Sequence, residues 1–153
     1  MNVRAYDPYI SEADFAERGA ERAGSLAALI EISDILTLHV PLTEETRRMI
    51  DVTALKRGSF LINASRGEVL DQQAALAALQ SGHLAGLALD VFDPEPPVAP
   101  LPDDPRLIVT PHIGGCSFEC KAEIGAMLYE KVAAFYRTDR TDRTDKTDRT
   151  YRS

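Results

Sequence analysis

Residues 34–40, DILTLHV, are the stretch that decides the fold of this 153-residue chain. The run is rich in apolar and β-branched residues, and Pro41 ends it, so it predicts a β-strand that is buried on both faces. Strands of this kind are typical of parallel sheets, which are covered by helices on both faces. Further strands, and the helices that connect them, are therefore expected elsewhere in the sequence.

Short apolar runs alternate with helical patterns on both sides of this stretch. Strands are predicted at 2–6, 59–64, 84–92 and 107–110, with a very short one around 21–23. Helices are predicted at 11–19, 25–33, 43–50, 71–80 and 117–136, with Ser11, Ser25, Thr43 and Asp71 as N-caps and a short turn at 51–56. This alternation predicts an α/β fold, a doubly wound, Rossmann-like parallel sheet with right-handed crossovers and helices on both faces.

Two segments do not fit the alternation. Residues 94–105 hold six of the nine prolines and are expected to form an exposed, stiff loop, because proline lacks the N–H donor that helices and central strands require. Residues 137–153 repeat Thr, Asp and a base and offer only Tyr151 for burial, which predicts a disordered tail. The expected organisation is a folded domain at 1–136 and a tail at 137–153.

Composition excludes several classes of protein. The net charge of −7 argues against general binding to nucleic acid, and no apolar run is long enough to cross a bilayer. Cys116 and Cys120 lack a second Cys/His pair, so neither a disulfide framework nor a metal site is expected. We expect a cytoplasmic globular protein with no nucleic-acid or membrane partner.

Three polar residues follow neighbouring strands of the predicted sheet. Arg66, Glu95 and His112 come after strands 59–64, 84–92 and 107–110, whose carboxyl ends share one edge, where open α/β sheets bind ligands. Arg66 can bind a carboxylate or carbonyl oxygen, His112 can exchange a proton, and Glu95 would favour the charged imidazole. Such a set suits the reduction of an oxo acid. Spacing alone equally allows solvated loop charges and a capping histidine.

Four blocks in this order carry a family resemblance: DILTLHVPLTEETRRMID from residue 34, FLINASRGEVLD from 60, GLALDVFDPEPP from 86 and VTPHIGG from 109. They resemble the D-isomer-specific 2-hydroxyacid dehydrogenases, the family of phosphoglycerate dehydrogenase and hydroxypyruvate/glyoxylate reductase. The resemblance extends more loosely over residues 1–136. It implies an NAD-dependent oxidoreductase that transfers hydride between nicotinamide and a small 2-hydroxy or 2-oxo acid. A homodimer is possible, because family members are usually dimers through the cofactor domain, but the oligomeric state is open on the sequence.

The resemblance also implies residue roles. It assigns catalysis to Arg66, Glu95 and His112, and it assigns the binding of the nicotinamide carboxamide to Asp90. Asp7 follows the strand at 2–6, where a carboxylate binds the adenosine ribose and repels a 2′-phosphate, which favours NAD over NADP. The other implied cofactor-binding residues are His39, Pro41, Thr46, Ala64, Ser65, Arg66, His112 and Gly114. No metal is implied.

The sequence departs from the family at its start. It has no G-x-G-x-x-G motif, and it opens at what resembles the second strand of the cofactor domain. We expect the C-terminal part of a longer enzyme, an incomplete Rossmann-like fold without its first strand and glycine-rich loop. Three outcomes are open for strands 2–6 and 34–40: direct pairing, poor folding, or completion by an upstream piece.

Two functions remain open on the sequence. The favoured one is an NAD-dependent 2-hydroxyacid dehydrogenase whose truncated chain binds NAD weakly and turns over little alone. The alternative is a non-catalytic remnant that serves as an interaction or dimerisation module. Another Rossmann enzyme, such as a methyltransferase, is disfavoured because it has no need of Arg, Glu and His at successive strand ends.

Overall fold

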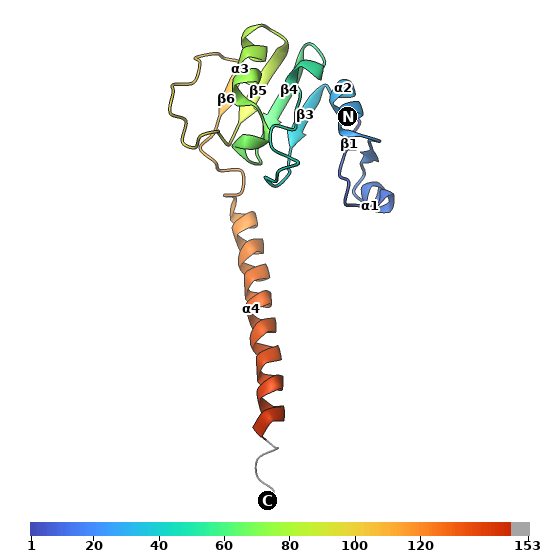
Figure 1. Cartoon of the computed structure of the whole chain (residues 1–153), viewed down its shortest axis with the longest axis vertical. Coiled ribbons are helices and arrows are strands. Elements are labelled where there is room, and N and C mark those ends of the chain that lie inside the picture. The colour runs from blue at the N-terminus through green and yellow to red at the C-terminus, as the bar shows by residue number, and fades with distance from the viewer. Residues whose placement is uncertain (148–153) are drawn as a thin grey trace, which may run out of the picture. The chain divides into compact units, whose positions relative to one another are not determined.

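The computed structural model describes residues 1–147, with side chains as far as Arg137 (Figure 1). The chain forms two compact units, Met1–His112 and Ile113–Ser153. The first unit contains all the described strands, and the second contains helix α4, Phe118–Thr147. Because the first unit also holds Arg66, Glu95 and His112, it is the part that bears on function.

The strands of the first unit form two parallel sheets. The smaller sheet pairs β1 (Arg4–Ala5) with β2 (Glu21–Arg22). The larger sheet has the order β3–β4–β5–β6, with bounds Ile35–Leu38, Ser59–Asn63, Leu84–Leu89 and Leu107–Val109. All of its neighbours are parallel, so the carboxyl ends of its strands share one edge. The predicted parallel, Rossmann-like sheet is confirmed.

One face of the larger sheet carries the hydrophobic core. Leu61 and Leu87 from its central strands are almost fully buried against Ile30 of α2 (Leu26–Ile32) and Leu79 of α3 (Gln72–Gln80). The opposite face, which bears Phe60, remains about half exposed. Within residues 1–112, helices therefore cover one face of this sheet, whereas the sequence predicted both.

The N-caps account for where the helices begin. Ser11 forms a capping box with Asp14 at α1 (Glu12–Glu17), and Ser25 and Asp71 each accept a backbone N–H in the first turn of α2 and α3. The predicted turn at 51–56 contains the short 3-10 helix η1, Val52–Ala54. These caps were predicted correctly because each one depends on a few neighbouring residues.

The helix predicted at 43–50 is wrong: the structure has a single turn there. Thr46 donates its hydroxyl to Pro41 O at 2.7 Å, and the Thr43 hydroxyl accepts the Thr46 N–H at 3.2 Å. Threonine side chains that bond to nearby backbone compete with helix formation. At Arg48 the backbone has a φ of +50°, which a right-handed helix cannot continue through.

The two sheets do not join through β1 and β3. In the described residues β1 pairs with β2, and β3 forms the edge of the larger sheet. Direct pairing, one of the three outcomes left open for these strands, is therefore excluded. Arg66, Glu95 and His112 follow β4, β5 and β6, so the lack of pairing between β1 and β3 does not alter the edge of the sheet on which these residues lie.

Helix α4 is longer than predicted. The sequence predicted its end at Tyr136 and disorder over 137–153, but the helix continues to Thr147. The repeat places Asp and a base four residues apart, and such pairs favour helix by a few tenths of a kcal/mol each. The rest of the predicted tail, 148–153, lies outside the described residues. No helix in the described part of the chain has the length and apolar character needed to cross a bilayer.

Candidate active site

Three loops meet at the carboxyl edge of the larger sheet. β4 leads into Arg66, β5 into Asp90, and β6 into His112. Backbone hydrogen bonds join these loops, since Asp90 N–H donates to Asn63 O and His112 N–H donates to Asp90 O, both at 2.9 Å. The predicted edge thus brings the backbones of the three loops together.

His112 and Glu95 form a direct pair. Nδ1 of His112 lies 2.6 Å from Oε1 of Glu95, and both side chains are a little under half exposed. The carboxylate can hold a proton on Nδ1 and so leaves Nε2 as the nitrogen that faces a substrate. This is the orientation that an acid/base histidine needs.

The backbone of His112 is itself unusual. Its φ of +53° lies in the left-handed region, which a non-glycine residue seldom adopts and which costs about 1–3 kcal/mol. Two hydrogen bonds from its N–H, to Asp90 O and to Thr110 O at 3.1 Å, hold it there. The surrounding backbone therefore imposes the conformation that directs the imidazole toward Glu95.

Arg66 lies on the neighbouring loop, and its side chain bonds to that loop and not to Glu95 or His112. Its Nη1 donates to the carbonyl of Ser65 at 2.6 Å, so the guanidinium turns back onto its own loop. The backbone of Arg66 is extended and precedes the short 3-10 helix η2, Gly67–Val69. The structure thus pairs Glu95 with His112 directly and places Arg66 on the adjacent strand end.

Gly67 explains how the arginine and glutamate loops come so close, and the sequence analysis missed it. A Cβ at this position would lie 1.8 Å from Phe92 O and 2.8 Å from Asp93 N. Only glycine permits that approach between the loop that carries Arg66 and the one that leads to Glu95. The signal available in the sequence was the glycine that directly follows Arg66.

Asp90 is held by Thr110, which is, after Gly67, another residue that the sequence analysis missed. Its carboxylate accepts the hydroxyl of Thr110, and its side chain is largely buried at the end of β5. A buried carboxylate at this edge is an acceptor suited to the amide group of a nicotinamide. Thr110 precedes His112 by two residues, so one short segment orients both groups.

The other residues that the sequence predicted to bind the cofactor fall into three groups. Ala64 and Ser65 lie in the loop after β4, and Ser65 is buried with its hydroxyl donated to Asn63. Pro41 and Thr46 are joined by the hydrogen bond described above, while His39 Nε2 lies 2.9 Å from the Thr37 hydroxyl. Gly114 belongs to the second unit, so its role stays a prediction.

Asp7 lies just after β1, beside an aromatic residue. Its carboxylate accepts the N–H of Tyr9 at 2.8 Å, and the Tyr9 hydroxyl donates to Glu45 at 3.3 Å. The negative charge of Glu45, and then this hydrogen bond, raise the pKa of Tyr9. Two carboxylates thus lie around one exposed tyrosine, in the segment that the sequence assigned to the ribose.

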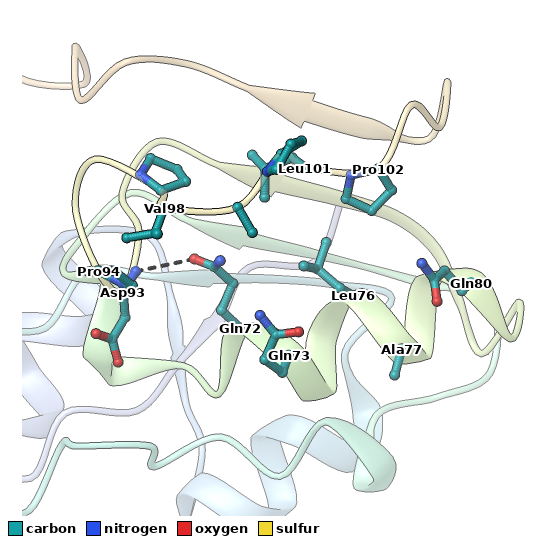
Figure 2. Close-up of a pocket in the computed structure, with 13 residues that line it drawn as sticks. Gln72, Gln73, Leu76, Ala77, Gln80, Asp93, Pro94, Val98, Leu101 and Pro102 are labelled. Carbon is teal, nitrogen blue, oxygen red and sulfur yellow. Dashed lines mark hydrogen bonds between the residues drawn. The ribbon is translucent and has the colours of Figure 1, made fainter.

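A separate groove of about 550 Å³ lies between α3 and the proline-rich loop (Figure 2). Gln72 and Gln73 line it from the helix, and Leu101 and Pro102 line it from the loop. Gln72 accepts the N–H of Asp93, which ties the loop to α3. None of the proposed catalytic residues lines this groove, so it is distinct from the edge that carries them.

Comparison with known proteins agrees with this geometry. Residues 1–114 match the family described as D-isomer specific 2-hydroxyacid dehydrogenase, NAD binding domain. The chain is 39% identical over 139 residues to D-3-phosphoglycerate dehydrogenase of Bacillus subtilis, covering 88% of this chain and 26% of that protein. It is 44% identical over 137 residues to (S)-sulfolactate dehydrogenase of Chromohalobacter salexigens, covering 86% and 44%.

Solved structures show the same likeness. The glyoxylate reductase of Paecilomyes thermophila superposes with a TM-score of 0.77 at 30% identity, covering 88% of this chain and 42% of that one. The Aquifex aeolicus D-lactate dehydrogenase, solved with NAD and lactic acid, gives 0.74 at 32% identity, with 91% and 47% covered. The chain spans less than half the length of each of these relatives. It belongs to the D-isomer-specific 2-hydroxyacid dehydrogenase family, as part of the NAD-binding domain.

Proposed function

We propose that this chain supplies the proton-transfer and nicotinamide-binding side of an NAD-dependent 2-hydroxyacid dehydrogenase. The observation that carries the proposal is the 2.6 Å contact between Glu95 and the left-handed His112. The reaction adds one hydride and one proton to the carbonyl of a 2-oxo acid, so a chain that performs it must hold a proton beside the substrate oxygen. His112, oriented by Glu95, is suited to that task.

The residues of this chain suit two of three parts of NAD, the nicotinamide carboxamide and the adenosine ribose, but not the pyrophosphate. Asp90 offers a buried carboxylate to the carboxamide, and Asp7 offers one to the adenosine ribose, where a 2′-phosphate would be repelled. The usual glycine-rich cradle for the pyrophosphate is not in this sequence. When bound, the reduced cofactor NADH would supply the hydride and would be left as NAD⁺. The missing cradle supports weak binding by the isolated chain.

Each protein group has one task in the proposed reduction. Arg66 binds the carboxylate of the 2-oxo acid and draws charge toward the carbonyl oxygen, for which its guanidinium must leave the Ser65 carbonyl. His112 would give its Nε2 proton to that oxygen, which becomes the hydroxyl of the 2-hydroxy acid. Glu95 stabilises the imidazolium before transfer and holds the neutral ring afterwards.

The test uses two measurements. NADH binding to the purified chain is followed by saturation-transfer NMR, with Asp90→Asn expected to weaken it. Activity is measured in a chimera in which residues 34–112 replace the matching segment of a full-length relative such as the Bacillus subtilis enzyme. Arg66→Ala, Glu95→Gln and His112→Ala should each lower kcat/KM with glyoxylate or hydroxypyruvate, His112→Ala by about 10²–10⁴.

Unchanged rates in an active chimera would remove the assignment and favour the non-catalytic interaction module. A cytoplasmic location, which rests on composition, and a homodimer, which rests on the resemblance, remain part of this proposal. Sedimentation of the purified chain tests the dimer.

A further inference from the structure

Asn63, the last residue of β4, is a buried amide that hydrogen-bonds at both ends. Its Oδ1 accepts the N–H of Ser65 at 3.1 Å and the Ser65 hydroxyl at 2.9 Å, while Nδ2 donates to Arg66 O at 2.9 Å. A carbonyl can only accept and a backbone N–H can only donate, so these partners define which way the amide faces. Only 1% of the residue is exposed.

The same residue joins the loops of the site. The carbonyl of Asn63 accepts the Asp90 N–H, and the carbonyl of Asp90 accepts the His112 N–H. On the other side, the guanidinium of Arg66 donates to the carbonyl of Ser65, and this Ser65–Arg66 peptide lies between the two peptides that the Asn63 side chain contacts. Asn63 is therefore the junction between the Arg66 loop and the two loops that carry Asp90 and His112.

Burying the Asn63 amide carries a desolvation free energy, which its hydrogen bonds to the loop must offset. An apolar side chain of similar size would pack at the end of β4 without any cost of desolvation. The amide instead supplies hydrogen-bond partners to the Ala64–Ser65 and Arg66–Gly67 peptides, which lie beyond the end of β4. Because all three of its hydrogen bonds go to residues 65 and 66, what it stabilises is the shape of this loop.

We propose that Asn63 is a positioning residue that holds the backbone of Arg66 in place beside Asp90 and His112. This inference rests on the proposed function for its purpose, but its structural content does not depend on catalysis. Without the amide, the loop loses its brace on both peptides. The guanidinium then samples many directions and binds a 2-oxo acid less tightly.

The test compares Asn63→Asp with Ser59→Ala in the full chain by ¹⁵N NMR. Aspartate keeps the acceptor for Ser65 but cannot donate to Arg66 O. Ser59 is the matched control because it is buried in the same strand, and its hydroxyl has no hydrogen-bond partner among the described residues. Ser65→Ala removes the hydrogen bond from the Ser65 hydroxyl to Asn63 Oδ1, and it is the substitute variant if Asn63→Asp does not fold.

In the wild-type chain, the amides of residues 64–66 should be as rigid as the sheet, with order parameters near 0.85. In Asn63→Asp they should fall below about 0.6, and the Arg66 Nε–H signal should shift toward that of a free arginine, with the β5 amides unchanged. In Ser65→Ala the same signals should move part of the way. Ser59→Ala should leave them unaltered.

A second readout separates this inference from the proposed function. Oxamate, an unreactive analogue of a 2-oxo acid, is titrated while the Arg66 signal is followed. Asn63→Asp should weaken its binding about tenfold, the loss of about one hydrogen bond to a charged group. If wild type fails to bind oxamate, the proposed function is in error while the order parameters still decide the role of Asn63. A folded Asn63→Asp, or failing that a Ser65→Ala, with unchanged signals at 64–66 overturns the inference.

Discussion

Replacing Gly67 by alanine probes how the loop that carries Arg66 and the loop that leads to Glu95 are held together. The added Cβ would lie 1.8 Å from Phe92 O and 2.1 Å from Phe92 C, whereas real Cβ atoms essentially never come within 3.0 Å of such atoms. The loops must therefore separate by about 1.2 Å. Both contact atoms are backbone, and Phe92 itself is buried, so no flexible side chain can move aside.

The expected cost is about 1–3 kcal/mol, the usual range for overpacking in a close-packed interior. With a urea m-value of about 1–3 kcal/mol/M, the midpoint of unfolding should fall by about 1 M. The control is Gly24→Ala, where no atom lies within 4 Å of the new Cβ and φ is not positive. Equal midpoints for the two variants would refute the reasoning. In a folded Gly67→Ala, the NMR signals of Glu95 should also shift, because its loop has moved.

Three further outcomes are expected. Asp71→Ala should destabilise the chain by about 0.5–2 kcal/mol in thermal unfolding, since the Ala74 N–H at the start of α3 loses its cap, and a loss below about 0.5 kcal/mol would contradict this. Glu45→Gln should lower the pKa of Tyr9, because the nearby negative charge and the hydrogen bond that favour the neutral phenol are weakened; a phenolate titration by NMR that does not move to lower pH would disprove it. Leu61→Ala should cost about 2–5 kcal/mol by urea unfolding, because the side chain is fully buried, and a loss below 1 kcal/mol would show that the core collapses around it.

The local signals in the sequence were sufficient for most elements of the fold. Apolar runs identified the strands of the larger sheet, and Ser11, Ser25 and Asp71 marked the starts of three helices. Placement of Arg66 at a strand end also followed, since strand and loop order are properties of the chain itself. Periodicity and capping depend on residues a few positions apart, so the sequence alone determines them.

Local sequence signals predicted the wrong structure in two segments. Thr43 had the features of an N-cap, but the bond from Thr46 to Pro41 O made a turn instead. The repeat after Tyr136 lacked apolar residues and was assigned to disorder, yet α4 continues to Thr147. In both segments, hydrogen bonds or charges within one or two turns outweighed the overall composition.

The sequence by itself determined the parallel sheet, the family, and the chemical groups available at one edge. Only the tertiary structure decided that Glu95 meets His112 at 2.6 Å, that Gly67 lets the backbone of one loop touch another, and that β1 and β3 stay apart. Each of these depends on how segments distant in the chain pack against one another. Local propensity carries no information about such distances, because they are set by the burial and hydrogen bonding of the whole unit.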